Sequence, residues 1–387
     1  MAFFREDEIG KWVGICVLVL ALELAPLGKA AQPGDPAIRR EVVGSLPEAL
    51  EIKSAELREG VYTAWALSLA RSGQKRIQDL PASREPGTPT LKNETRLDQA
   101  RTVTRIAMAV ASDMRKHLAG FDVNMDELVA AALTYKIDQS GRAPEGGTGN
   151  PLAAEIVRLA DGVFWVVAER EGLLAGGTSP PASPAVPFMR MGPRIKVDEA
   201  LREGVIKSLP EAKLIKNQEL RERLYDAWAL GLSKSGYKRI EDIRGSAGVT
   251  SARLTKGNQA DHLRGTARLA VAIGEEMKRC FPEIRLDTDE PMAGGLLHDV
   301  GKPYEYDPDN QKRWLGDPRR TGYPALRHPI YGVYIALTAG LPEEICHMVG
   351  AHAAEGRQIR RSTAGELVAA ADEQFWAIAQ AAGLMTK

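Results

Sequence analysis

The chain has little cysteine, no net charge and no strictly alternating β-type segments, and each absence excludes a class of protein. Cys16, Cys280 and Cys346 are too few for a disulfide framework, and none has the CxxC spacing of a thiolate zinc site. Basic and acidic residues number 51 each among 387, so overall charge favours neither nucleic acid nor an anionic membrane as a partner. A metal would have to be held by histidine and carboxylate side chains.

Long apolar runs are also scarce, and the one near the N-terminus, from Val13 to Ala25, is too short for a comfortable transmembrane span. Gly28 and Ala30 have the spacing of a signal-peptidase site, which makes residues 1–30 a candidate signal peptide. Acidic residues before and within the run, such as Glu23, favour an uncleaved anchor or a cytoplasmic extension instead. Cleavage would imply a periplasmic or secreted protein, and its absence a cytoplasmic one.

The sequence contains a long internal repeat. The 35 residues from Ser45 and the 35 residues from Ser208 are identical at 23 positions, without a gap, at an offset of 163. Later blocks align at the same offset, and the final blocks align at an offset of 211, so the first copy lacks 48 residues of the second. Chance does not produce such identity, and we interpret it as a duplication.

Both copies carry the apolar periodicity of helices. Apolar residues recur at three- and four-residue spacing in segments such as "LRGTARLAVAIGEEM" and "GELVAAADEQFWAIAQAAG". The segment "AGGTSPPASPAVPFMRMGPR", rich in Pro, Gly and Ser, is typical of an exposed linker. We therefore expect an all-α chain of two tandem helical bundles, over residues 36–174 and 198–387, joined by a linker over residues 175–197.

Histidine is almost confined to the second copy, which holds five of the six histidines. If these residues only packed a bundle, some would be expected in both copies. Asp372, near the end of the second copy, is the one residue of the polar set with a matching acid in the first copy, Asp161. Gln99 replaces His262, Tyr135-Lys136 replaces His298-Asp299, and the segment absent from the first copy contains His328, His347 and His352.

The order of these residues resembles the HD superfamily of metal-dependent hydrolases, with the His-Asp pair set in "LLHDVGK". The resemblance covers residues 255–385 well and the first copy only as a degenerate relative that lacks the ligands. It implies one metal held by the first histidine, the pair and the final aspartate, and a second metal held by two further histidines, with the aspartate of the pair bridging. The implied ligands are His262, His298, Asp299, His328, His352 and Asp372.

A site of imidazoles and carboxylates suits one or two ions of Fe, Mn, Co, Ni or Zn. Such ions lower the pKa of a bound water, so that hydroxide forms at neutral pH. The resemblance thus implies hydrolysis of a small anionic molecule, most simply a phosphoester attacked by metal-bound hydroxide, with Asp299 at the reacting centre and Lys302 neutralising the substrate's charge. No nucleic-acid partner is predicted, and a homo-oligomer remains open.

Several alternatives stay open at this point. The same family pattern would serve hydrolysis or hydration of a small non-phosphate molecule, a di-iron oxygenase, or a non-catalytic metal-binding or scaffold protein. Lys302 is equally well interpreted as a solvated lysine after a helix. His347 lies five residues before His352, which turns it about 140° away on one helix. We therefore predict that His352 is the ligand. His347 is then an ordinary helix residue or, alternatively, a residue that contacts a ligand or the substrate.

Overall fold

The computed structural model describes residues 35–83, 88–135, 137, 150–177 and 190–386. The candidate signal peptide, Lys136 and most of the predicted linker lie outside the described residues. Within the described ranges the regular structure is helical apart from two small two-stranded hairpins, which confirms the predicted all-α class. Among these helices, none combines the length and the apolar character needed to cross a membrane.

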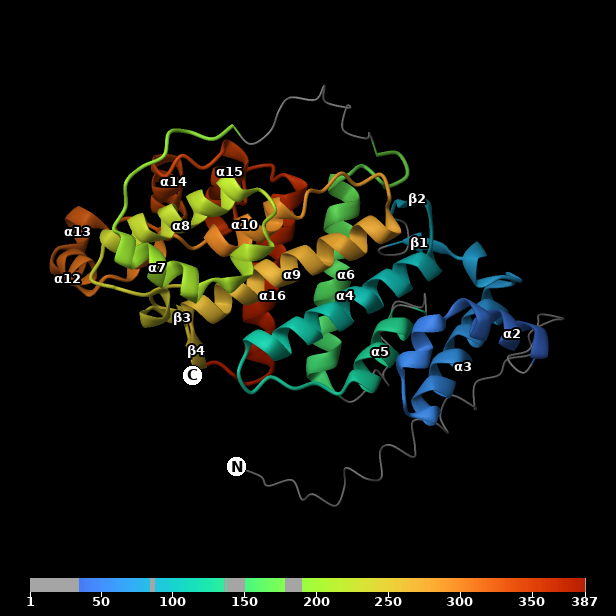
Figure 1. Cartoon of the computed structure of the whole chain (residues 1–387). Helices are drawn as coiled ribbons and strands as arrows, with labels where there is room; N and C mark the ends of the chain where they lie inside the picture. Colours follow the sequence, from blue (N-terminus) through green and yellow to red (C-terminus); the bar gives the residue numbers. More distant parts are fainter. Residues whose placement is uncertain (1–34, 84–87, 136, 138–149, 178–189, 387) are drawn as a thin grey trace, which may run out of the picture.

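The first half of the chain runs through short helices and one small hairpin into a long helix (Figure 1). Its elements are α2 (Pro36–Ser45), a 3-10 helix (Pro47–Glu51), α3 (Ala55–Ser72), a 3-10 helix (Ile77–Asp79), β1 (Pro81–Ser83), β2 (Thr90–Thr95), α4 (Arg96–His117), α5 (Met125–Thr134) and α6 (Pro151–Arg170).

The second half begins with the same order of elements and then adds helices of its own. Its elements are α7 (Glu199–Ser208), a 3-10 helix (Pro210–Leu214), α8 (Gln218–Ser233), a 3-10 helix (Ile240–Asp242), β3 (Arg244–Ser246), β4 (Arg253–Asn258), α9 (Gln259–Cys280), α10 (Asp289–Leu297), α11 (Lys302–Tyr306), α12 (Pro308–Gly316), α13 (Pro318–Thr321), α14 (His328–Thr338), α15 (Glu343–Ala351), a 3-10 helix (Ala354–Gly356) and α16 (Thr363–Ala381).

The two long helices, α4 and α9, begin in the same way. Each follows an antiparallel hairpin directly, β1–β2 before α4 and β3–β4 before α9. Thr95 and Asp98 form a capping box at the start of α4, and Asn258 and Asp261 form one at the start of α9. Because each box satisfies backbone N–H groups at the exposed helix end, it fixes where the helix starts relative to its hairpin.

Helix α4 lies along α9, and α6 lies against α16, so the two halves pack on each other (Figure 1). The main buried cluster contains residues from both halves, while a smaller one is confined to the first half. Two ion pairs cross the α4–α9 contact, Arg105 with Glu276 at 2.8 Å and Arg268 with Asp113 at 4.0 Å. An offset of 163 converts each pair into the other, so the halves meet about an approximate two-fold axis.

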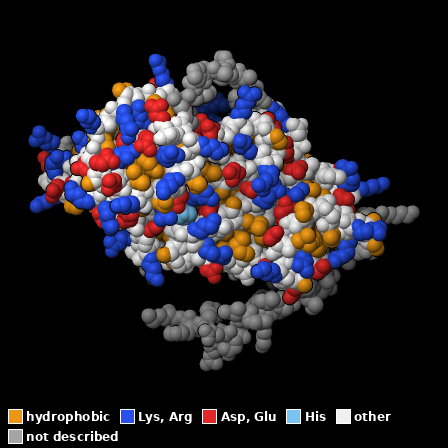
Figure 2. Space-filling model, viewed as in Figure 1, with side chains coloured by type: hydrophobic (Ala, Val, Ile, Leu, Met, Phe, Trp, Pro, Cys, Tyr) orange, Lys and Arg blue, Asp and Glu red, His pale blue; other side chains and the backbone are white. Residues whose placement is uncertain are grey.

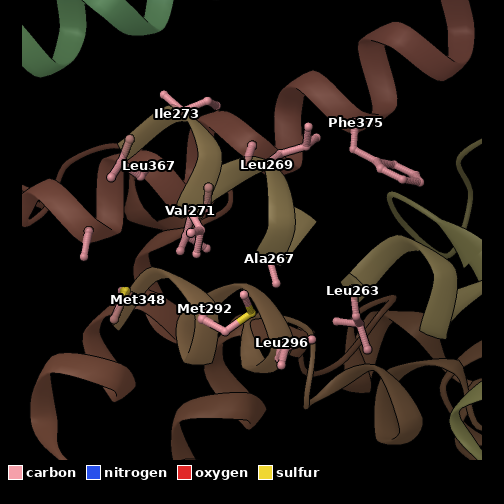
Figure 3. Close-up of a cluster of buried hydrophobic side chains, with 14 of the residues drawn as sticks. Leu263, Ala267, Leu269, Val271, Ile273, Met292, Leu296, Met348, Leu367 and Phe375 are labelled. Atoms are coloured by element: carbon pink, nitrogen blue, oxygen red, sulfur yellow. The ribbon is translucent and has the colours of Figure 1, made fainter. Parts of the chain in front are cut away.

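A tight apolar core fixes α9 against its neighbours in the second half. Figure 3 shows Ala267 and Leu263 of α9 facing Leu296 of α10, with Phe375 of α16 nearby. Gly295 makes the approach of α10 to α9 close, because a Cβ atom there would lie 2.5 Å from the Cα atom of Ala267. These contacts hold the three helices that carry most of the polar residues described below.

The face of the molecule seen in Figure 2 carries charges of both signs without segregation. Figure 2 shows lysine and arginine side chains interspersed with aspartate and glutamate over the visible face. This agrees with the zero formal net charge of the sequence.

Glu290, at the start of α10, should make stability depend on pH. Burial, reinforced by Asp287 and Glu344, raises the pKa of Glu290 to about 7, whereas an unfolded glutamate titrates near ~4.3. Between these values only the folded chain keeps the proton, so stability falls as pH rises from about 4.3 to about 7. Glu290→Gln should raise the free energy of unfolding by about 1–2 kcal/mol at pH 8 and leave it unchanged at pH 4.

Thermal or urea unfolding at the two pH values measures this difference. Glu283→Gln, at an exposed position on the preceding loop, is the matched control and should show no such pH dependence. Equal stabilisation by Glu290→Gln at both pH values would contradict the prediction.

Candidate metal centre

Six polar side chains from five helices meet inside the second half. Two of them follow the C-terminal end of α10, one begins α14, and one directly follows α15. The remaining two lie within α9 and α16, one on each helix. Five of the six are buried, and the sixth, Asp372, has a side chain only 19% exposed. The group comprises all the predicted ligands: His262, His298, Asp299, His328, His352 and Asp372.

The first part of the group gathers around His262. Its Nε2 atom lies 3.0 Å from Nε2 of His298 and 3.3 Å from both Oδ2 of Asp299 and Oδ1 of Asp372. Nε2 of His298 lies 3.1 Å from Oδ2 of Asp299. Ligands about 2.1 Å from one ion are separated by roughly 3.0–3.5 Å, so these four atoms have the spacing of a coordination shell.

The second part gathers around the other oxygen of Asp299. Oδ1 lies 3.1 Å from Nε2 of His328 and 3.7 Å from Nε2 of His352, and these two nitrogens are 3.3 Å apart. Asp299 therefore faces one set of ligand atoms with each of its carboxylate oxygens. A carboxylate placed in this way could contribute one oxygen to each of two ions.

The ring nitrogens that face each other carry lone pairs. Nδ1 of His298 is 2.7 Å from the carbonyl oxygen of Gly295, and Nδ1 of His352 is 2.8 Å from that of Val349. Since a carbonyl oxygen only accepts, we assign the proton of each neutral ring to Nδ1, which leaves Nε2 as an acceptor. These two lone pairs lie beside the carboxylates of Asp299 and Asp372, in an environment that favours a cation.

Burial would lower the pKa of His298, but Asp299 raises it and so favours a second proton on this ring. The other ionisation states suit metal binding. Burial and the neighbouring His298 lower the pKa of His352 to about 3. Burial alone would raise the pKa of Asp299 and Asp372, but the surrounding histidines, with Lys302 beside Asp299, hold both well below the usual range. Ionised carboxylates and a neutral imidazole are the forms that coordinate metals.

Glu305 is part of the centre, although sequence reasoning did not identify it. This fully buried carboxylate accepts from Nδ1 of His328 at 2.6 Å and from Nη1 of Arg327 at 2.7 Å. The bond fixes the tautomer of His328 with its Nε2 lone pair towards Asp299. Burial would raise the pKa of Glu305, but His328 and Arg327 lower it. The only signal in the sequence is an acid six residues after Asp299, which does not reveal its partner.

Lys302 is buried beside Asp299 and is 1% exposed, so the solvated-lysine alternative does not hold. Its Nζ atom lies 2.6 Å from Oδ2 of Asp299 and donates to the carbonyl oxygen of Ser246 at 2.7 Å and to Oε1 of Gln259 at 3.4 Å. Burial favours the neutral amine, yet Asp299 raises the pKa of Lys302 and keeps it charged. The hairpin β3–β4 thus contributes a backbone carbonyl that directs this cation at the centre.

Gly301, in the "HDVGK" turn, allows α14 to reach the centre. A Cβ atom on this residue would lie 2.2 Å from the carbonyl oxygen of His328 and 2.7 Å from the amide nitrogen of Gly332. Only glycine therefore leaves room for the start of α14 beside the turn that carries Asp299.

His347 lies outside the group, as predicted. It is half-buried on α15, and its Nε2 atom accepts a hydrogen bond from the backbone amide of Ser362 at 3.1 Å. Burial and the nearby Arg361 lower its pKa.

The corresponding place in the first half is satisfied by the protein's own hydrogen bonds. Gln99 donates from Nε2 to Oδ1 of Asp161 at 2.8 Å, and Trp165 donates to the same oxygen at 3.1 Å. In the second half Trp376 likewise donates to Oδ1 of Asp372, at 3.0 Å, but an imidazole stands where the amide would be. An amide donor therefore meets Asp161, whereas an imidazole meets Asp372, so the two aspartates have different requirements for a cation.

Comparison with known families agrees with this geometry. Residues 260–373 match the family model of the HD domain, in agreement with the resemblance that the order of the ligands predicted. No significant match was found among curated proteins or among solved structures. HD domains form a superfamily of metal-dependent hydrolases, and the clusters of His262, His298 and Asp372 and of His298, Asp299 and His352 could each hold an ion.

Proposed function

We propose that the chain is a metal-dependent hydrolase of a small anionic molecule, most simply a phosphoester, with a dinuclear centre bridged by Asp299. One observation carries the proposal. Two sets of buried acceptor atoms converge on the two oxygens of this single carboxylate. Nε2 of His328 and Nε2 of His352 face each other at 3.3 Å with their lone pairs, and a cation between such buried lone pairs would stabilise the arrangement.

The residues around the centre have distinct proposed roles. The first ion would be held by His262, His298 and Asp372, and the second by His328 and His352. Fe, Mn, Co, Ni or Zn would suit these donors. Divalent ions in such a centre lower the pKa of water enough to supply a nucleophile at neutral pH. Lys302 places a positive charge beside Asp299, where it would stabilise negative charge that develops on the substrate.

The rest of the chain has a structural part in this proposal. Residues 36–174 form a degenerate HD-like repeat whose helices α4 and α6 pack against α9 and α16. Residues 198–387 form the catalytic unit, and residues 175–197 connect the two. A small-molecule substrate needs no nucleic-acid surface, and the interspersed surface charges support that expectation (Figure 2).

A second candidate is a di-iron oxygenase, because a mixed set of histidines and carboxylates bridged by an aspartate is also suited to iron. Oxygen uptake in the presence of substrate would identify it, whereas hydrolysis of a phosphate panel or an amide panel would identify the hydrolytic forms. Absence of bound metal would leave only the scaffold alternative.

The test is metal content per chain by elemental analysis after anaerobic purification without chelating resin. We expect close to two ions in the wild type and close to one in His328→Ala, because His328 contacts only the Oδ1 side of Asp299. His347→Ala, a histidine replacement outside the centre, is the matched control and should keep both ions. One ion in all three proteins would contradict the dinuclear proposal.

A further inference from the structure

The C-terminal end of α6, in the first half, contacts the segment that follows His352 in the second half. Arg170, the last residue of α6, forms an ion pair with Oε1 of Glu366 on α16. The other oxygen of Glu366 accepts from Nη1 of Arg361 at 3.2 Å. Nε of Arg361 then donates to the carbonyl oxygen of Ala351 at 2.6 Å.

This chain of contacts ends beside a proposed metal ligand. Ala351 is the last residue of α15, and His352 follows it at once. Carbonyl groups in the last turn of a helix have no partner within the helix, so a guanidinium that binds one fixes the direction in which the helix ends. The following segment also folds tightly over this point, since a Cβ atom on Gly356 would lie 2.2 Å from the carbonyl oxygen of Ala351.

A second contact from the same helix end reaches the other side of the segment. Thr363, the first residue of α16, donates its hydroxyl to Glu171, which directly follows α6. The side chains of Arg170, Glu366 and Arg361 are 22%, 10% and 18% exposed, so solvent screens these charges only partly. Residues 361–366 are therefore held between α15 and the first half.

We infer that the first half, through Arg170, positions His352 for the second ion of the centre. The inference rests on the proposed dinuclear centre and assigns a task to the half that lacks its own ligands. His352 is the more distant of the two histidines from Oδ1 of Asp299, at 3.7 Å, and its ring is oriented by a carbonyl oxygen of its own helix, that of Val349. A shift of the end of α15 would therefore move this ligand and leave those on α9 and α10 in place.

The experiment is a calorimetric titration of Mn²⁺ into metal-free full-length protein. In Arg170→Gln we expect the second ion to bind about tenfold more weakly and the first ion to bind as in the wild type. Tenfold is the lower end of the loss in affinity caused by removing residues that support metal ligands. Arg361→Gln should have the same effect, and the double variant should be little worse than either single one, because both act through one connection.

The matched control is Arg158→Gln on the same helix, where Arg158 forms a more exposed ion pair with Glu155. Its two binding steps should equal those of the wild type. If Arg170→Gln behaves like this control, or weakens both steps equally, the inference is wrong. Should Arg170→Gln fail to fold, Arg361→Gln tests the same connection from the second half.

The titration also separates this inference from the proposal beneath it. A wild type that binds a single ion would overturn the dinuclear centre and the inference with it. Two steps in the wild type that remain unaltered in Arg170→Gln and Arg361→Gln would overturn the inference alone.

Discussion

Asp372→Asn should weaken binding of the first ion by more than 100-fold and reduce turnover at least as much. The loss should exceed that caused by removing a residue that only supports a metal ligand. The amide keeps the size of the side chain and an oxygen that can accept from Trp376. It loses the negative charge, and that charge faces His262 at 3.3 Å and His298 at 3.7 Å in a largely buried site. Metal content and Mn²⁺ titration measure the effect directly.

The first half supplies a close control, Asp161→Asn. Asp161 occupies the corresponding place on α6 and accepts from Trp165 as Asp372 does from Trp376. Its other donor is Gln99, so the substitution should leave the metal content at the wild-type value. Equal metal loss in both variants would mean that the defect is one of folding, and retention of both ions in Asp372→Asn would remove Asp372 from the ligand set.

Gly301→Ala should be among the most damaging replacements that leave every polar side chain intact. The added methyl group would meet backbone atoms of His328 and Gly332, which cannot rotate away as a side chain would. We expect a loss of about 3 kcal/mol or more in the free energy of unfolding, at or above the upper end for overpacking. The start of α14 would also have to move from Asp299, so the second ion should be lost. Urea unfolding and metal analysis test the two effects.

Gly204→Ala, in the middle of α7, is the control for this change. A Cβ atom there meets nothing within 4 Å, so alanine should stabilise the helix by about 0.5–1 kcal/mol. A small effect of Gly301→Ala, within about 0.5 kcal/mol of wild type, would show that the turn and α14 can separate freely.

The sequence predicted the helical class and the set of residues that meet at the centre. The helices could be predicted because apolar periodicity is a local property of the sequence. The ligands could be predicted because the first copy lacks the histidines of the second, Gln99 against His262 being the clearest case. The structure brings all six together, although their task as ligands remains a prediction that metal analysis must test.

The partners of those residues could not be predicted in the same way. Glu305 meets His328 across 23 positions of sequence, and Lys302 meets a carbonyl oxygen of Ser246 across 56. Such contacts depend on how helices and hairpins pack, which local spacing does not encode. The core shared by the two halves could not be predicted for the same reason. Periodicity shows that a helix has an apolar face, but it does not show which helix covers that face.

The approximate two-fold packing of α4 on α9 has a consequence for assembly. Two separate chains that met through this surface would dissociate on dilution, whereas here the linker keeps the partners at a high effective concentration. Folding should accordingly be unimolecular with respect to this contact, with no dependence of the midpoint on protein concentration. The surface that covers α9 is then always supplied by the same chain. The first half, which supplies this surface, can lose catalytic residues while the ion pairs Arg105–Glu276 and Arg268–Asp113 persist.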